Sequence, residues 1–79
     1  MARVLLFGRL ADAAGWRERT VEADSLSALR AALTASDAQL GEALAGPGVQ
    51  AAVDKTILRG DAPLTAASEV AFLPPMSGG

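Results

Sequence analysis

The sequence predicts an α+β fold in which one sheet of about five strands packs against one main helix. Short β-rich segments lie near both ends of the chain, and leucines with helical spacing lie between them. With 79 residues there is room for one small domain. The expected order is strand, strand, helix, short helix, then three strands, which is typical of an α+β domain.

Two strands are expected before the main helix. Residues 3–8, RVLLFG, form a nearly continuous apolar run, which indicates a central strand covered on both faces. Residues 18–23, ERTVEA, alternate as a half-buried strand does. Gly15 is a natural turn residue between them. The two strands are therefore expected to form a hairpin whose tip lies at residues 13–16.

The main helix is predicted to begin at Leu26 and to run for about three turns. Asp24 or Ser25 can cap it, because both side chains accept hydrogen bonds from the first turn of a helix. Leu29 and Leu33 continue its apolar stripe, with helix-favouring alanines between them.

A second, shorter helix is predicted after it. Ser36 and Gln39 have the spacing of a capping box, and Leu40 and Leu44 lie about one helical turn apart. The Gly-Pro-Gly sequence at residues 46–48 cannot continue a helix and is expected to end it.

Three strands are expected in the last third of the chain. Residues 50–53 and 56–58 would be joined around Asp54 and Lys55, and Leu64 would be a buried anchor in the turn that follows. The last strand, residues 69–73, is expected to alternate: Val70 and Phe72 would face one side of the sheet, Ala71 and Leu73 the other. Two prolines end it, because proline has no backbone N–H for a ladder.

Composition excludes most kinds of self-sufficient active site. The chain has no Cys and no His, so a zinc site, a thiol nucleophile and an imidazole base are not expected. The absence of disulfides makes the cytoplasm the default location. A net charge of −2 argues against nucleic acid as a partner. No apolar run reaches the ~18 residues of a membrane span, and Gly8 and Arg9 interrupt the first apolar run too early for a signal peptide.

The chain closes with FLPPMSGG, residues 72–79. We expect a domain at residues 1–73 and an extended tail at residues 74–79, since the prolines favour an extended exit. The two final glycines lack a Cβ, so the tail can enter a channel only as wide as a backbone. A terminal carboxylate is ionised at neutral pH and is a poor electrophile. It must be activated to react, for example as a mixed anhydride with AMP.

The closing octet, preceded by AAVDKTI and DAPLTAASEVA, resembles the end of the MoaD-type sulfur carriers, the small subunits of molybdopterin synthase in the ubiquitin-like MoaD/ThiS family. The opening VLLFGRLADAAG is also similar to that family, so the resemblance spans essentially the whole chain. It implies a β-grasp fold with a mixed sheet. It further implies a non-catalytic carrier that a MoeB-like enzyme adenylates and that a sulfur-donating transferase converts to a thiocarboxylate. The sulfur would then pass to a cyclic pyranopterin.

The resemblance also assigns roles to residues. Gly79 would carry AMP transiently and then the sulfur as 1-thioglycine, with Gly78 as its unhindered neighbour. No cofactor or metal would be bound otherwise. The large synthase subunit would be the main partner, in a heterotetramer of two small and two large chains, and no activity is expected from this chain alone. The residues implied to dock on partners are Ile57, Phe72, Leu73, Pro74, Pro75 and Met76; a place in the core is at least as good an interpretation for Phe72.

Three other functions remain open from the sequence. A sulfur carrier of the thiamin-thiazole type shares the terminal glycines and the activation chemistry. A ubiquitin-like protein modifier would use the same acyl-adenylate to form isopeptide bonds with lysines. A passive interaction domain would tolerate the loss of Gly79.

Overall fold

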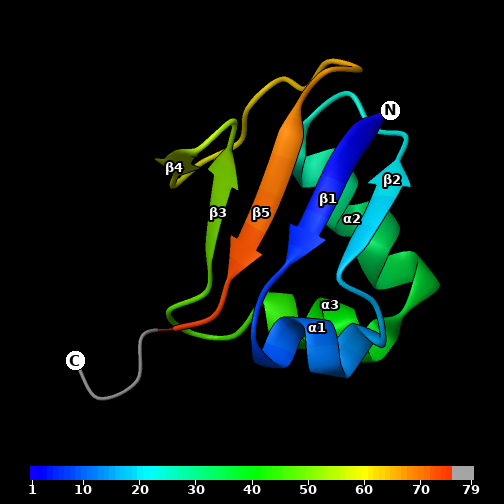
Figure 1. Ribbon diagram of the computed structural model, residues 1–79, viewed down its shortest axis with the longest axis vertical. Coiled ribbons are helices and arrows are strands. Elements are labelled where there is room, and N and C mark those ends of the chain that lie inside the picture. The colour runs from blue at the N-terminus through cyan, green and yellow to red at the C-terminus, as the bar shows by residue number, and fades with distance from the viewer. Residues whose placement is uncertain (76–79) are drawn as a thin grey trace.

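The computed structural model describes residues 1–75, and in that part of the chain five strands and three helices are found (Figure 1). The strands form one mixed sheet in the order β2-β1-β5-β3-β4, in which β1 and β5 are parallel and the other pairs are antiparallel. The expected α+β class is confirmed. The elements are β1 (Ala2–Leu6), α1 (Arg9–Ala14), β2 (Glu18–Val21), α2 (Leu26–Ser36), α3 (Ala38–Leu44), β3 (Gln50–Val53), β4 (Thr56–Leu58) and β5 (Glu69–Leu73).

The hydrophobic core lies between one face of the sheet and the helices. Figure 1 shows α2 behind the sheet and α1 and α3 across its lower end. Along β5 the predicted alternation is confirmed, since Val70 and Phe72 are buried and Ala71 and Leu73 are partly exposed. Leu64, after the β3–β4 hairpin, is also buried as predicted. The largest fully buried side chains are Phe72, Leu10, Leu26, Leu29, Leu33, Leu40, Val4 and Val70.

The central position of β1 in the sheet was predicted correctly, but the prediction that both of its faces are covered is wrong. β1 is an interior strand with partners on both sides. Its side chains nevertheless alternate, with Val4 buried, Arg3 exposed and Leu5 half-buried. Helices pack on only one side of this sheet, so an apolar residue such as Leu5 lies on the uncovered face.

The predicted hairpin tip is wrong. β1 and β2 pair antiparallel as expected, but the helix α1 connects them, where a simple turn was predicted. Leu10 and Ala11 on this helix are buried in the core. Gly15 ends α1 in the left-handed region, at φ 82°, and its N–H donates to the carbonyl of Ala11 at 2.8 Å. A six-residue helix is too short for its periodicity to stand out in sequence, and burial against α3 stabilises it.

The helix caps are partly as predicted. The Ser25 hydroxyl accepts a hydrogen bond from the N–H of Ala28 at 3.1 Å, which confirms it as the cap of α2. The capping box of Ser36 and Gln39 is wrong, because Ser36 is the last residue of α2. Asp37 caps α3, and its Oδ1 accepts from the N–H groups of Gln39 and Leu40 at 3.0 and 3.1 Å. Asp37 alone separates the two helices, so it serves as C-cap of one and N-cap of the other.

Candidate functional site

The C-terminal tail leaves from the middle strand of the sheet. β5 lies between β1 and β3 and ends at Leu73, as predicted from the two prolines that follow. Because β1 runs parallel to β5 and β3 runs antiparallel, the loop after β1 and the loop before β3 both lie beside Pro74 and Pro75. Pro74 and Pro75, which we call the tail root, therefore lie between these two loops.

Several predicted site residues lie outside the described part of the chain: Met76, Gly78 and Gly79. Four residues follow Pro75, and a fully extended chain of that length spans at most about 14 Å.

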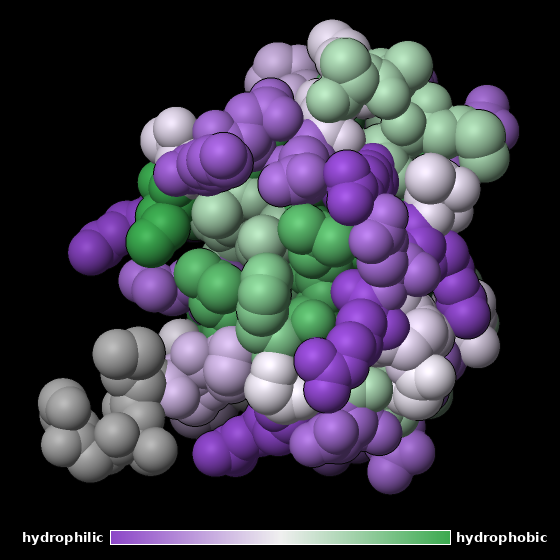
Figure 2. Space-filling view, viewed as in Figure 1, coloured by the Kyte–Doolittle hydropathy of each residue, from purple (hydrophilic) through white to green (hydrophobic). Residues whose placement is uncertain are grey.

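The uncovered face of the sheet carries an apolar patch. Strand registers place Ile57 beside Ala52, Ala52 beside Ala71, and Ala71 beside Leu5, in one row across four strands. Leu73 lies two residues beyond Ala71 on the same face. Figure 2 shows this face with apolar side chains at its centre and hydrophilic ones around them. We call Leu5, Ala52, Ile57, Ala71 and Leu73 the open-face patch.

Two of the predicted docking residues, Ile57 and Leu73, belong to the open-face patch, and Ile57 is the more exposed of the two. Its side chain is 51% exposed, which is unusual for an isoleucine in a strand. Leu73 and the two prolines are half-buried. These residues stay candidates for contact with a partner, and the fold brings Ile57 and Leu73 onto one surface.

Phe72 does not belong to that surface. Its side chain is fully buried, and it points to the helix side of the sheet, where the guanidinium of Arg30 lies 5.4 Å from the ring centroid. The prediction of a docking role for Phe72 is therefore corrected in favour of the core. Side chains alternate along a strand, so Phe72 and Leu73 cannot face the same partner.

Sequence reasoning missed two residues of the uncovered face. Leu5 and Phe7 were both assigned to a strand covered on both sides. Phe7 is 46% exposed, and its N–H donates to the carbonyl of Phe72 at 3.3 Å, which extends the β1–β5 pairing to the end of β5. The position of Arg3 within the apolar run was the signal, since counting by twos from it reaches both Leu5 and Phe7.

An ion-pair network borders the open-face patch on the side away from the tail. The Nε of Arg3 lies 2.6 Å from Oε2 of Glu18, and its Nη1 lies 3.5 Å from Oε2 of Glu69. The hydrogen bond and negative charge of Glu18 raise the pKa of the Arg3 guanidinium above its ordinary value. The arginine is thus charged and compensated, and this margin of the face is polar.

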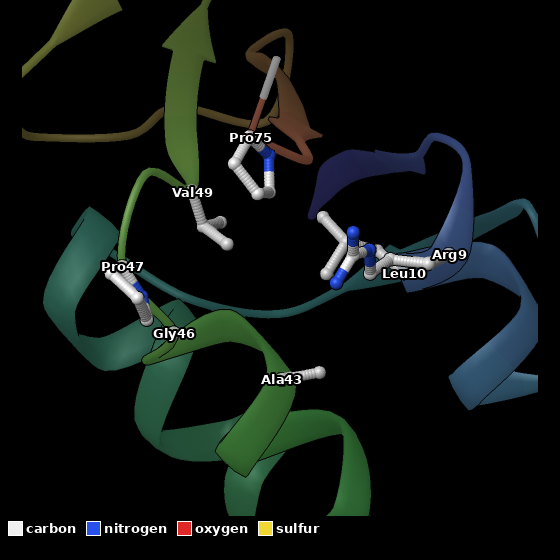
Figure 3. Close-up of a pocket in the computed structure, with 7 residues that line it drawn as sticks. All are labelled: Arg9, Leu10, Ala43, Gly46, Pro47, Val49 and Pro75. Atoms are coloured by element: carbon white, nitrogen blue, oxygen red, sulfur yellow. The ribbon is translucent and has the colours of Figure 1, made fainter. Parts of the chain in front are cut away.

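A groove lies on the helix side of the tail root, with a volume of about 340 Å³ (Figure 3). Among the described residues that line it, Arg9 is the one with a charge. Among residues 1–75 no three Cys, His, Asp or Glu side chains are grouped as metal ligands. The groove therefore has a concave surface with one positive charge, and its described lining residues include no acid–base pair. The lining residues are Arg9, Leu10, Ala43, Gly46, Pro47, Val49 and Pro75.

Within the described residues, none of the helices has both the length and the apolar character needed to cross a membrane.

Two sequence comparisons relate the chain to known proteins. The model of the ThiS family matches residues 4–79. The molybdopterin synthase sulfur carrier subunit of Escherichia coli (strain K12) is 37% identical over 81 residues, with both chains fully covered.

Two solved structures share the fold. SAMP1 from Haloferax volcanii has a TM-score of 0.81 at 24% identity, covering 99% of this chain and 98% of its own. The small archaeal modifier protein 1 of Methanosarcina acetivorans has a TM-score of 0.82 at 22% identity, covering 99% and 95%. The expected β-grasp, ubiquitin-like fold is confirmed.

Proposed function

The chain belongs to the ThiS family, and from this we propose that it is the sulfur-carrier subunit of a molybdopterin synthase. The observation that carries the proposal is its likeness, along the whole chain, to a molybdopterin synthase sulfur carrier subunit. The position of the tail supports it, because the middle strand of the sheet leads directly into Pro74 and Pro75. The terminal glycines then follow within a few residues.

The proposed chemistry begins at the carboxylate of Gly79. One carboxylate oxygen attacks the α-phosphorus of ATP, pyrophosphate leaves, and an acyl-adenylate forms. A donor at the oxidation level of sulfide then attacks the acyl carbon, AMP leaves, and the product is a thiocarboxylate. A partner that adenylates and a transferase that supplies sulfur are both required, since this chain has no nucleophilic or acid–base side chain suited to either step. The thiocarboxylate sulfur then bonds to a carbon of the pterin precursor and displaces an oxygen leaving group from it, which gives a thioester. Water attacks the acyl carbon of that thioester, the C–S bond to the carrier breaks, the sulfur stays on the pterin as a thiol, and the carboxylate is restored.

Docking would use the open-face patch. A partly exposed apolar patch next to the tail root is a suitable surface for a large synthase subunit, because apolar area buried on association stabilises a complex. The same surface is positioned to meet a MoeB-like adenylating enzyme at an earlier stage. The tail would enter the active site of either partner while this face holds the carrier in place. We propose the cytoplasm as the location of this exchange.

The alternatives are less well supported. A function as a thiamin-thiazole carrier fits the family model equally well. The full-length likeness of this chain to a molybdopterin synthase subunit favours the synthase. The archaeal modifier proteins are less than 25% identical, so they support the fold and not a function in protein modification.

The test is adenylation-dependent pyrophosphate exchange with a MoeB-like enzyme, together with the intact mass of the protein from its native cells. A thiocarboxylate replaces one oxygen by sulfur and adds about 16 Da. Removing Gly79 shortens the tail by about 3.5 Å, and exchange should be lost. Gly78→Val should also be poor, since a β-branched side chain would obstruct the passage.

Ser77→Ala is the matched control for these two variants, because it changes the tail without altering its length or adding bulk. It should exchange normally. All three variants should melt within about 1–2 °C of the unmodified protein, as surface substitutions do. Normal exchange by the chain without Gly79 would refute the carrier function.

A further inference from the structure

We infer that Gly8 and Gly48 are positioning residues for the tail, and we call this pair the glycine clasp. A Cβ placed on Gly8 would lie 3.0 Å from Cγ of Pro74. A Cβ placed on Gly48 would lie 2.7 Å from Cβ of Pro75. Each of the two prolines thus lies against one glycine: a Cβ on Gly48 would overlap the Pro75 ring, and a Cβ on Gly8 would be tight against the Pro74 ring.

The two glycines of the clasp lie on opposite sides of β5. Gly8 lies in the loop that follows β1, and Gly48 lies in the loop that precedes β3. These two strands flank β5 in the sheet, so the loops approach its C-terminal end from opposite directions. Figure 3 shows Pro75 above the groove, close to Val49, which directly follows Gly48.

Both glycines have backbone conformations that other residues rarely adopt. Gly8 has φ 58° and Gly48 has φ 82°. The loops can therefore turn sharply and present bare backbone to the prolines. A proline ring cannot rotate away from an intruding methyl group as a flexible side chain would. A side chain on either glycine must therefore displace the tail root or the loop itself.

The consequence for activity rests on the proposed carrier function. The clasp fixes the position of Pro74 and Pro75. In the proposed function, the residues that follow them bring the carboxylate to the reacting atoms. A displacement of about 1 Å at a reacting group can cost up to a hundredfold in rate. Because the open-face patch is not altered, a displaced tail should lower kcat for adenylation and leave KM nearly unchanged.

The test compares Gly48→Ala with Gly15→Ala. Gly15 has the same φ of 82°, and nothing lies within 4 Å of a Cβ placed there. Both variants carry the strain of a left-handed alanine, and each should melt about 4–8 °C lower. Only Gly48→Ala intrudes on the tail. The measurements are pyrophosphate exchange with a MoeB-like enzyme, and the NMR signals of Pro74 and Pro75 in ¹³C-proline-labelled protein.

Gly48→Ala should lower kcat about tenfold or more at unchanged KM, shift the signals of Pro75, and remove the nuclear Overhauser contact between residue 48 and the Pro75 ring. Gly15→Ala should leave all of these as in the unmodified protein. Equal kcat in the two variants, or unshifted Pro75 signals, would overturn the inference. If the unmodified protein is not adenylated, the proposed function fails, and the Pro75 signals alone decide whether the clasp exists.

Discussion

Asp54 and Glu69 are joined by two hydrogen bonds. The N–H of Asp54 donates to the carbonyl of Glu69 at 2.8 Å, and the N–H of Glu69 donates to Oδ1 of Asp54 at 3.0 Å. Asp54 lies in the turn between β3 and β4, and Glu69 is the first residue of β5. The pair therefore ties the hairpin to the start of the strand that carries the tail.

Asp54→Ala should lower the free energy of unfolding by about 1–2 kcal/mol, because the N–H of Glu69 loses its acceptor and alanine tolerates the left-handed region less well. Asp54 has φ 49°, and asparagine is tolerated there and keeps an acceptor oxygen. Asp54→Asn should accordingly stay within about 0.5 kcal/mol of the unmodified protein. Urea denaturation measures both variants, and equal losses in the two would show that the hydrogen bond contributes nothing.

Lys55→Gly should stabilise the β3–β4 hairpin. Lys55 has φ 72°, and hairpin turns with two residues of positive φ favour glycine at the second position. Relief of this strain should raise the free energy of unfolding by about 0.5–1 kcal/mol. Lys55→Ala is the control, since it removes the charge and keeps the strain, and it should change stability little. A gain with alanine equal to that with glycine would mean that charge, and not conformation, is responsible.

Asp61 should make stability depend on acid pH. Its Oδ1 accepts hydrogen bonds from the N–H groups of Ser27, in the first turn of α2, and of Ala62, at 2.8 and 2.9 Å. These bonds hold the pKa of Asp61 below its ordinary value of 3.8. A lowered pKa in the folded state means that the stabilisation is complete above pH 3.8 and is lost as the pH falls through the folded pKa.

The check is a series of thermal melts between neutral pH and about pH 2. Below about pH 4 the melting temperature of the unmodified protein should fall more than that of Asp61→Asn, because the variant has no carboxylate at this position to protonate. Parallel curves for the two proteins would contradict the role of Asp61.

Ile57→Asp should weaken binding to a large synthase subunit at least tenfold, because a charge would be buried in an apolar interface. Its melting temperature should hold within a few degrees, since the side chain is half exposed. Thr56→Asp is the matched control. It places the same charge on the adjacent residue, which faces the opposite side of β4 and is also exposed. Binding measured by calorimetry should be unaffected by Thr56→Asp, and equal weakening by both variants would move the docking surface away from the open-face patch.

The chain itself determined the order of the main elements and the nature of its end. Period-two alternation in residues 69–73 predicted which side chains of β5 share a face, and the spacing of Leu26, Leu29 and Leu33 predicted α2. These patterns are local, and apolar periodicity records them directly. The backbone behaviour of the prolines and terminal glycines could be predicted equally well from the sequence, because it does not depend on neighbouring residues.

The tertiary structure decided what depends on packing between distant segments. Whether Leu5 is buried or part of the open-face patch depends on the helices covering only one face of the sheet. Helix α1 forms because Leu10 and Ala11 reach the core, although six residues carry too little periodicity to indicate a helix alone. The contacts of Gly8 with Pro74 and Gly48 with Pro75 join residues more than 25 positions apart. They exist only because β1 and β3 flank β5, and no local pattern records which strands become neighbours.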